Sequence, residues 1–99
     1  MSDSESKSIR LPEQFVQLQL GALKEIVDHH RADASCVQFD AEEVETVDGA
    51  AIQFLHAVAK LQADKKQDAL VINACEVIAN AISDMGLTDQ ISLNLAAEN

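Results

Sequence analysis

Apolar runs typical of strands alternate with longer segments of helical periodicity along this chain of 99 residues. The strand candidates are residues 8–11, 35–39, 69–72 and 91–95, and a helical segment separates each one from the next. Strands that alternate with helices need crossover connections, which are right-handed and favour parallel pairing. The order therefore predicts a small α/β layer fold with about four mixed or mostly parallel strands and three or four helices.

The first two helices differ in how clearly their starts are marked. Residues 16–30 or 19–30 have helical spacing, and although the first of them also alternate like a strand, the length of the pattern favours a helix. Residues 50–63 form the second apolar stripe, and Asp48 or Gly49 precedes it as the N-cap. A loop anchored by apolar residues is expected before this cap.

The last helix and the strand before it are predicted from residues 69–87. ALVI at 69–72 is a continuous apolar run, typical of a central strand covered on both faces. Asn73 is the expected cap of a helix whose apolar stripe ends at Met85. Gly86 is the expected C-cap glycine, and Leu87 the hydrophobic residue that follows such a cap.

The composition indicates an aliphatic core in one domain. Hydrophobic residues make up 47% of the chain but aromatic residues only 3%, with no Trp and no Tyr. This length fits a single domain, which we place at residues 9–95. Residues 1–8 and 96–99 are polar or small and are expected to be tails.

The charge balance excludes several classes of partner. Seven basic residues against seventeen acidic ones give a formal charge of -10, which disfavours nucleic acid and anionic membrane surfaces because both attract clustered Lys and Arg. No apolar run of membrane-spanning length occurs, so we expect no membrane insertion. Cys36 and Cys75 are expected to be free thiols, and the polar first residues do not resemble a signal peptide, so we expect a cytoplasmic protein.

Catalytic and metal-binding patterns are weak. His29 and Asp33 share a helical spacing but have no further ligands beside them, and the acids of 40–48 lack the spacing of a calcium loop. Cys75 lies near a helix start without a base beside it, and we expect a small buried residue. Neither a phosphate-binding glycine loop nor a nucleophile elbow is present. We therefore expect no metal and no cofactor.

The turn Asp48-Gly49-Ala50-Ala51 is the most distinctive local feature. It follows an acidic connector and opens an apolar helix. One interpretation is an Asp N-cap with small residues packed against the sheet. The other is a binding site, because a helix N-terminus presents free N–H groups and Gly49 permits close approach.

Two stretches resemble the STAS domain, the fold of bacterial anti-sigma factor antagonists. They are VQFDAEEVETVDGAAIQFL at 37–55 and ALVINACEVIANAISDMGL at 69–87. Both follow the family order of a strand, a connector or turn, and an apolar helix. The resemblance covers about residues 9–95 and is closest to the small stand-alone STAS proteins found beside chemotaxis genes.

The resemblance implies a non-enzymatic regulatory protein. In switching members, a partner kinase phosphorylates the hydroxyl residue that follows the aspartate, and the added charge blocks binding. Only Asp48 is kept here, because the acceptor falls on Gly49, the next small residue on Ala50 and the family glycine on Ala51. Three possibilities stay open: constitutive binding, phosphorylation of Thr46 instead, or a role like that of the STAS accessory subunit of bacterial lipid transporters.

The expected partner is a protein, either an anti-sigma factor or kinase-like protein or a chemotaxis signalling protein. We expect a monomer or a weak dimer. The expected contacts surround the turn and the helix behind it: Asp48, Gly49, Ala50, Ala51, Gln53, Phe54 and Ala57. The rival from another class is an enzyme or a nucleotide or lipid binder with a pocket at the strand ends.

Overall fold

A parallel four-stranded sheet is the centre of the computed structural model, which describes residues 7–31, 37–62 and 69–95. Its strands, in spatial order, are β1 (Lys7–Arg10), β3 (Val37–Asp40), β5 (Val71–Ala74) and β6 (Leu93–Leu95). Each neighbouring pair is parallel, as crossover connections require. The predicted α/β architecture is confirmed.

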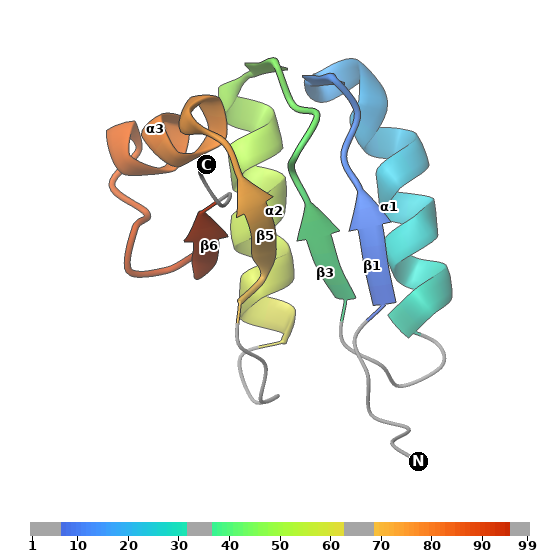
Figure 1. The fold of residues 1–99 in the computed structure, drawn as a ribbon. Helices are drawn as coiled ribbons and strands as arrows, with labels where there is room; N and C mark the ends of the chain where they lie inside the picture. The colour runs from blue at the N-terminus through green and yellow to red at the C-terminus, as the bar shows by residue number, and fades with distance from the viewer. Residues whose placement is uncertain (1–6, 32–36, 63–68, 96–99) are drawn as a thin grey trace.

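Three helices connect the strands of this sheet: α1 (Gln17–Arg31), α2 (Gly49–Leu61) and α3 (Glu76–Asp84). In Figure 1, α1 and α2 lie behind the sheet and run in the same direction, both starting at the end where the strands finish. α3 packs against α2. The two long helices therefore form one layer against one face of the sheet.

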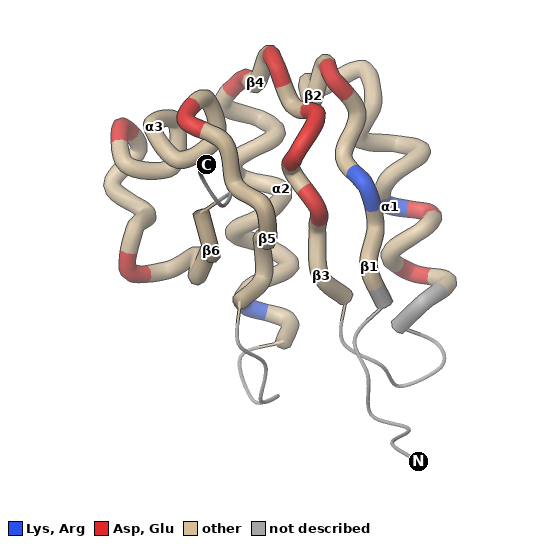
Figure 2. The backbone as a smooth tube through the Cα atoms, in the orientation of Figure 1, with Lys and Arg blue, Asp and Glu red and all other residues tan. Residues whose placement is uncertain are grey.

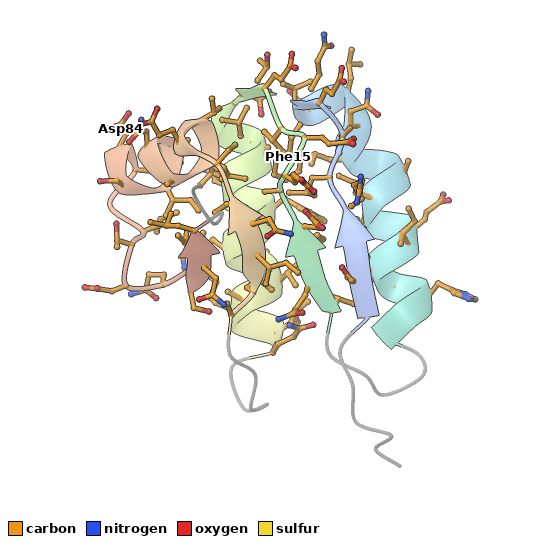
Figure 3. The ribbon with its side chains drawn as sticks, in the orientation of Figure 1. Phe15 and Asp84 are labelled. Atoms are coloured by element: carbon orange, nitrogen blue, oxygen red, sulfur yellow. The ribbon has the colours of Figure 1, made fainter. Side chains whose placement is uncertain are left out.

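Alternating side chains of the strands fill the space between these layers. Ile9, Val37, Phe39 and Val71 are at most 5% exposed, whereas their neighbours Ser8, Arg10, Gln38 and Asp40 are exposed or half-buried. Such a period of two is expected of strands with one face on the core. Phe15 lies in the same core, and Asp84 lies at the outer end of α3 (Figure 3).

A second, two-stranded parallel sheet was not predicted. It pairs β2 (Gln14–Phe15) with β4 (Thr46–Val47). The backbone N–H groups of Glu45 and Thr46 both donate to the carbonyl of Glu13, at 2.7 and 3.0 Å. The prediction of a loop before α2 was wrong where β4 occurs. A strand of two residues is too short to show a periodic pattern in the sequence. This pair holds the approaches to α1 and α2 together.

The other strand boundaries differ from the prediction by one or two residues. β1 starts at Lys7, so the predicted tail was wrong at residues 7 and 8, and β5 starts two residues after Ala69. β6 starts at Leu93, because Ile91 is buried in the preceding turn rather than paired in the sheet. Residues 1–6, 32–36, 63–68 and 96–99, on which parts of the predicted tails and element ends fall, lie outside the described residues.

The end of α3 was predicted correctly and its start was not. The N–H of Gly86 donates to Ser83, and the N–H of Leu87 donates to Ile82. With Gly86 at φ 72°, this is the Schellman arrangement. The predicted cap Asn73 instead belongs to β5, with φ 53°, and Cys75 occupies the cap position without a side-chain cap bond.

Candidate partner-binding site

The Asp48 carboxylate holds the starts of two helices. Its Oδ1 accepts a hydrogen bond from the N–H of Ala51 at 2.9 Å, as predicted for the N-cap of α2. Its Oδ2 accepts from the N–H of Gln17, the first residue of α1, at 3.0 Å. Val16, which precedes α1, has no side-chain acceptor, so α1 uses a carboxylate that lies 31 residues later in the chain. This second bond has no signal in the sequence.

Gly49 is the exposed first residue of α2. A Cβ added there would meet no heavy atom of residues 7–31, 37–62 or 69–95 within 4 Å beyond its own helix and chain neighbours, and the backbone is not in the left-handed region. The protein's own packing therefore does not require glycine at this position. A serine side chain would also fit.

The two alanines of the turn have different environments. Ala50 is half-buried at the surface, whereas Ala51 is completely buried in the core. The expectation that Ala51 contacts a partner is therefore wrong, because its side chain does not reach the surface. It packs in the apolar cluster behind the turn.

A groove of about 430 Å³ runs between α1 and α2. The α1 wall consists of Leu20, Gly21, Lys24, Val27 and Asp28. The α2 wall consists of Ala50, Gln53, Phe54, Ala57, Val58 and Leu61. The groove is mainly apolar, and Leu61 at its far end is 53% exposed.

The structure brings four of the predicted contacts together on the α2 wall: Ala50, Gln53, Phe54 and Ala57. Phe54 is held from behind by edge-to-face contacts with Phe15 and Phe39, at centroid distances of 6.4 and 5.8 Å. The α2 wall therefore presents one aromatic ring that packs against two buried rings of the core.

The α1 wall was not predicted as part of a site. Leu20 and Val27 belong to the same periodic stripe that predicts the core, so the sequence does not separate the groove from the core. Gly21 is the one available signal, because a glycine interrupts a helical pattern there.

An acidic edge lies at the end of the molecule where α1 and α2 begin. It comprises Glu13, Asp40, Glu42, Glu43, Glu45 and Asp48. Figure 2 shows acidic residues over β2, β4 and the end of β3. Arg10 lies 2.9 Å from the Glu43 carboxylate and 4.0 Å from that of Asp40. This one cation leaves the edge strongly negative.

The remaining candidate residues lie apart from the groove. Thr46 is exposed on β4. Cys75 is half-buried and its thiol donates to the carbonyl of Val44 at 3.3 Å, so it is less buried than expected. His29 is exposed on α1, and Asp33 lies outside the described residues. Within residues 7–31, 37–62 and 69–95, no group of three or more His, Cys, Asp and Glu side chains has a metal-binding arrangement.

Comparisons with known proteins give no assignment: no family model, curated protein or solved structure matches the chain. In the described part of the chain, no helix has both the length and the apolar character needed to cross a bilayer.

Proposed function

We propose that this chain is a non-enzymatic, STAS-like protein-binding module that uses the start of α2 and the α1–α2 groove. The observation that carries the proposal is the position of Ala50, Gln53, Phe54 and Ala57, which line one apolar groove beside the Asp48 turn. Exposed apolar surface bordered by polar groups is typical of interaction sites. The sequence resemblance to anti-sigma factor antagonists supports the same surface.

The proposed module binds constitutively. The position that carries the phosphorylated hydroxyl in switching STAS domains holds Gly49, which has no hydroxyl group. Because this position is exposed and has space for a side chain, steric exclusion does not explain the glycine. The partner is a cytoplasmic signalling protein with a basic face, of the anti-sigma factor, kinase-like or chemotaxis type, and the acidic edge speeds its encounter.

A second candidate function is favoured by the apolar lining of the same groove. An apolar small molecule such as a lipid chain, alone or as part of a lipid-transport complex, would also be held by such a surface. Thermal unfolding with and without lipids or nucleotides distinguishes the two, because a ligand that binds the folded state raises the midpoint.

Replacing Ala50 with arginine tests the proposed surface. We expect Ala50→Arg to abolish capture of the partner from the source cells, because a charged side chain then stands at the groove mouth. Gln90→Arg is the matched control, since Gln90 is exposed in the turn after α3. Both variants are first compared by circular dichroism. Equal capture by wild type and Ala50→Arg would rule this surface out.

The absence of a phosphoswitch is tested at residue 49. We expect the co-purifying kinase, if the partner is one, to leave residues 44–55 unmodified in mass spectrometry. Gly49→Ser places a hydroxyl at an unhindered position and is the positive comparison, and Gly49→Glu places a negative charge there and is expected to weaken the complex. Phosphate on Thr46 of the wild-type chain would contradict constitutive binding.

A further inference from the structure

No contact within the described part of the chain requires glycine at position 21. Gly21 lies in the second turn of α1, inside the helix, where glycine is destabilising relative to alanine. Apart from the backbone of α1 itself, a Cβ at this position would meet no described heavy atom within 4 Å, and the Gly21 backbone is not left-handed. Gly21 lines the groove, whereas Gly49 and Gly86 do not. The absence of a side chain at position 21 leaves space on the α1 wall for a binding partner.

The groove has the periodicity and length of a helix-docking surface. Its α2 wall repeats at i, i+3, i+4, i+7, i+8 and i+11 from Ala50 to Leu61, which corresponds to roughly 16 Å at the helical rise. The small residues Gly21, Ala50 and Ala57 permit close approach of a third helix, whose side-chain ridges would lie between those of the walls. A strand is disfavoured because the backbone groups within α1 and α2 are already hydrogen-bonded in the helices.

The charged residues around the groove indicate where a docked helix would carry basic side chains. Lys24 and Asp28 are exposed on the α1 wall, one turn apart, and neither has an ion-pair partner among the described residues. At the end where α1 and α2 begin, Glu13 and Glu45 are exposed beside each other. A complementary helix therefore carries basic residues at the end that lies against Glu13 and Glu45.

We propose that the groove binds an amphipathic helix of the partner protein, with its apolar stripe between α1 and α2 and its basic end at the acidic edge. This inference rests on the proposed function and specifies the partner segment and the second wall that it contacts. Gly21 belongs to the specificity of the site, because a larger side chain there occupies the space of the incoming helix.

The test uses a synthetic helical peptide and the full chain labelled with ¹⁵N. The peptide has leucines at i, i+3, i+4 and i+7 and lysines at one end, and the control peptide has the same residues in an order without an apolar stripe. We expect saturable shifts of the Gly21, Ala50 and Ala57 amides with the first peptide only. Shifts confined to other surfaces, or equal shifts with both peptides, would overturn the inference. Shifts in the groove with palmitate but not with the peptide would assign it to an apolar small molecule instead.

Two leucine variants separate binding from stability. Gly21→Leu fills the α1 wall, and we expect it to lower peptide affinity by at least about tenfold without lowering the melting temperature. Ala22→Leu adds the same side chain at the next position, on the exposed side of α1 away from the groove, and leaves the affinity unchanged. Equal affinities of the two variants would contradict the inference.

The same variants separate this inference from the proposed function. If Ala50→Arg abolishes partner capture and Gly21→Leu does not, the protein-binding function stands and the helix in the groove is wrong. If neither variant affects capture, both proposals fail. A double Glu13→Gln/Glu45→Gln variant is expected to weaken peptide binding mainly at low salt, and unchanged binding would exclude the proposed orientation of the basic end.

Discussion

The Asp48 carboxylate has a structural role, because it holds the starts of α1 and α2. Each of its oxygens accepts a backbone N–H, from Ala51 and from Gln17. An anion at two helix N-termini also interacts favourably with both helix dipoles. The hydrogen bonds within the fold therefore account for the one turn residue that matches the STAS resemblance, and the proposed binding surface begins beside it.

Substitution of Asp48 separates its two bonds. We expect Asp48→Ala to lower the free energy of unfolding by about 2 kcal/mol, as the sum of two lost caps of about 1 kcal/mol each. Asp48→Asn keeps one acceptor oxygen and is expected to lose about half as much. Urea unfolding followed by circular dichroism measures both values. An asparagine variant as stable as wild type would show that one of the two bonds contributes nothing.

At the scale of elements, Gln62 joins the end of α2 to the start of β3. Its side-chain Oε1 accepts from the N–H of Val37 at 2.8 Å, and its Nε2 donates to the carbonyl of Val37 at 3.2 Å. Gln62 is only 5% exposed, so these bonds form in a low-dielectric environment where unmet polar groups are costly. The Gln62 amide thus forms the two backbone hydrogen bonds of Val37 that a neighbouring strand would otherwise form.

The contribution of this junction is measured with two near-isosteric variants. Gln62→Met removes both bonds at similar volume, and we expect it to lower the free energy of unfolding by about 2 kcal/mol. Gln62→Glu keeps the acceptor for the Val37 N–H, but it removes the donor and buries a charge. We expect it to become less damaging as pH falls and its carboxyl group becomes protonated. Denaturant titrations at neutral and mildly acidic pH distinguish the two, and a methionine variant as stable as wild type would contradict this role.

The sequence predicts the parts of this fold that depend on residues close to one another in the chain, such as helical stripes and helix caps. The stripe of α2, its Asp48 cap and the Gly86 end of α3 follow from residues that are neighbours in the chain. The β2–β4 pair, the Asp48–Gln17 bond and the α1 wall depend on segments about 30 residues apart. Gly21 is an example: the sequence shows that a glycine destabilises this helix, but it does not show that the glycine lines a groove.

At the scale of the whole molecule, a formal charge of -10 is spread over a body of 35 × 32 × 23 Å. Ions screen charges over about 30 Å at 0.01 M salt but only about 8 Å at 0.15 M. At low salt the screening length is therefore comparable to the whole molecule, so acids on different elements repel one another. Such repulsion opposes a compact state, and we expect its effect to be strongest at the acidic edge.

Stability is therefore expected to rise with salt. We predict a higher melting temperature in 0.15 M than in 0.01 M sodium chloride, because screening weakens the repulsion between acids. A Glu42→Gln/Glu45→Gln variant has two fewer exposed acids and is expected to show a smaller increase. Thermal scans followed by circular dichroism provide the measurement. A melting temperature independent of salt would indicate that the acids do not affect one another's energy.

The shared Asp48 carboxylate also has a consequence for the order in which the chain folds. α1 begins at Gln17 after a residue without a side-chain acceptor, and the Gln17 N–H is capped by the Asp48 carboxylate. Closing a loop of this length has an entropic cost before any contact forms. We therefore expect α2, which carries its own cap, to nucleate first and α1 to complete its first turn afterwards. The groove between them would then be the last part of this layer to form and the first to open.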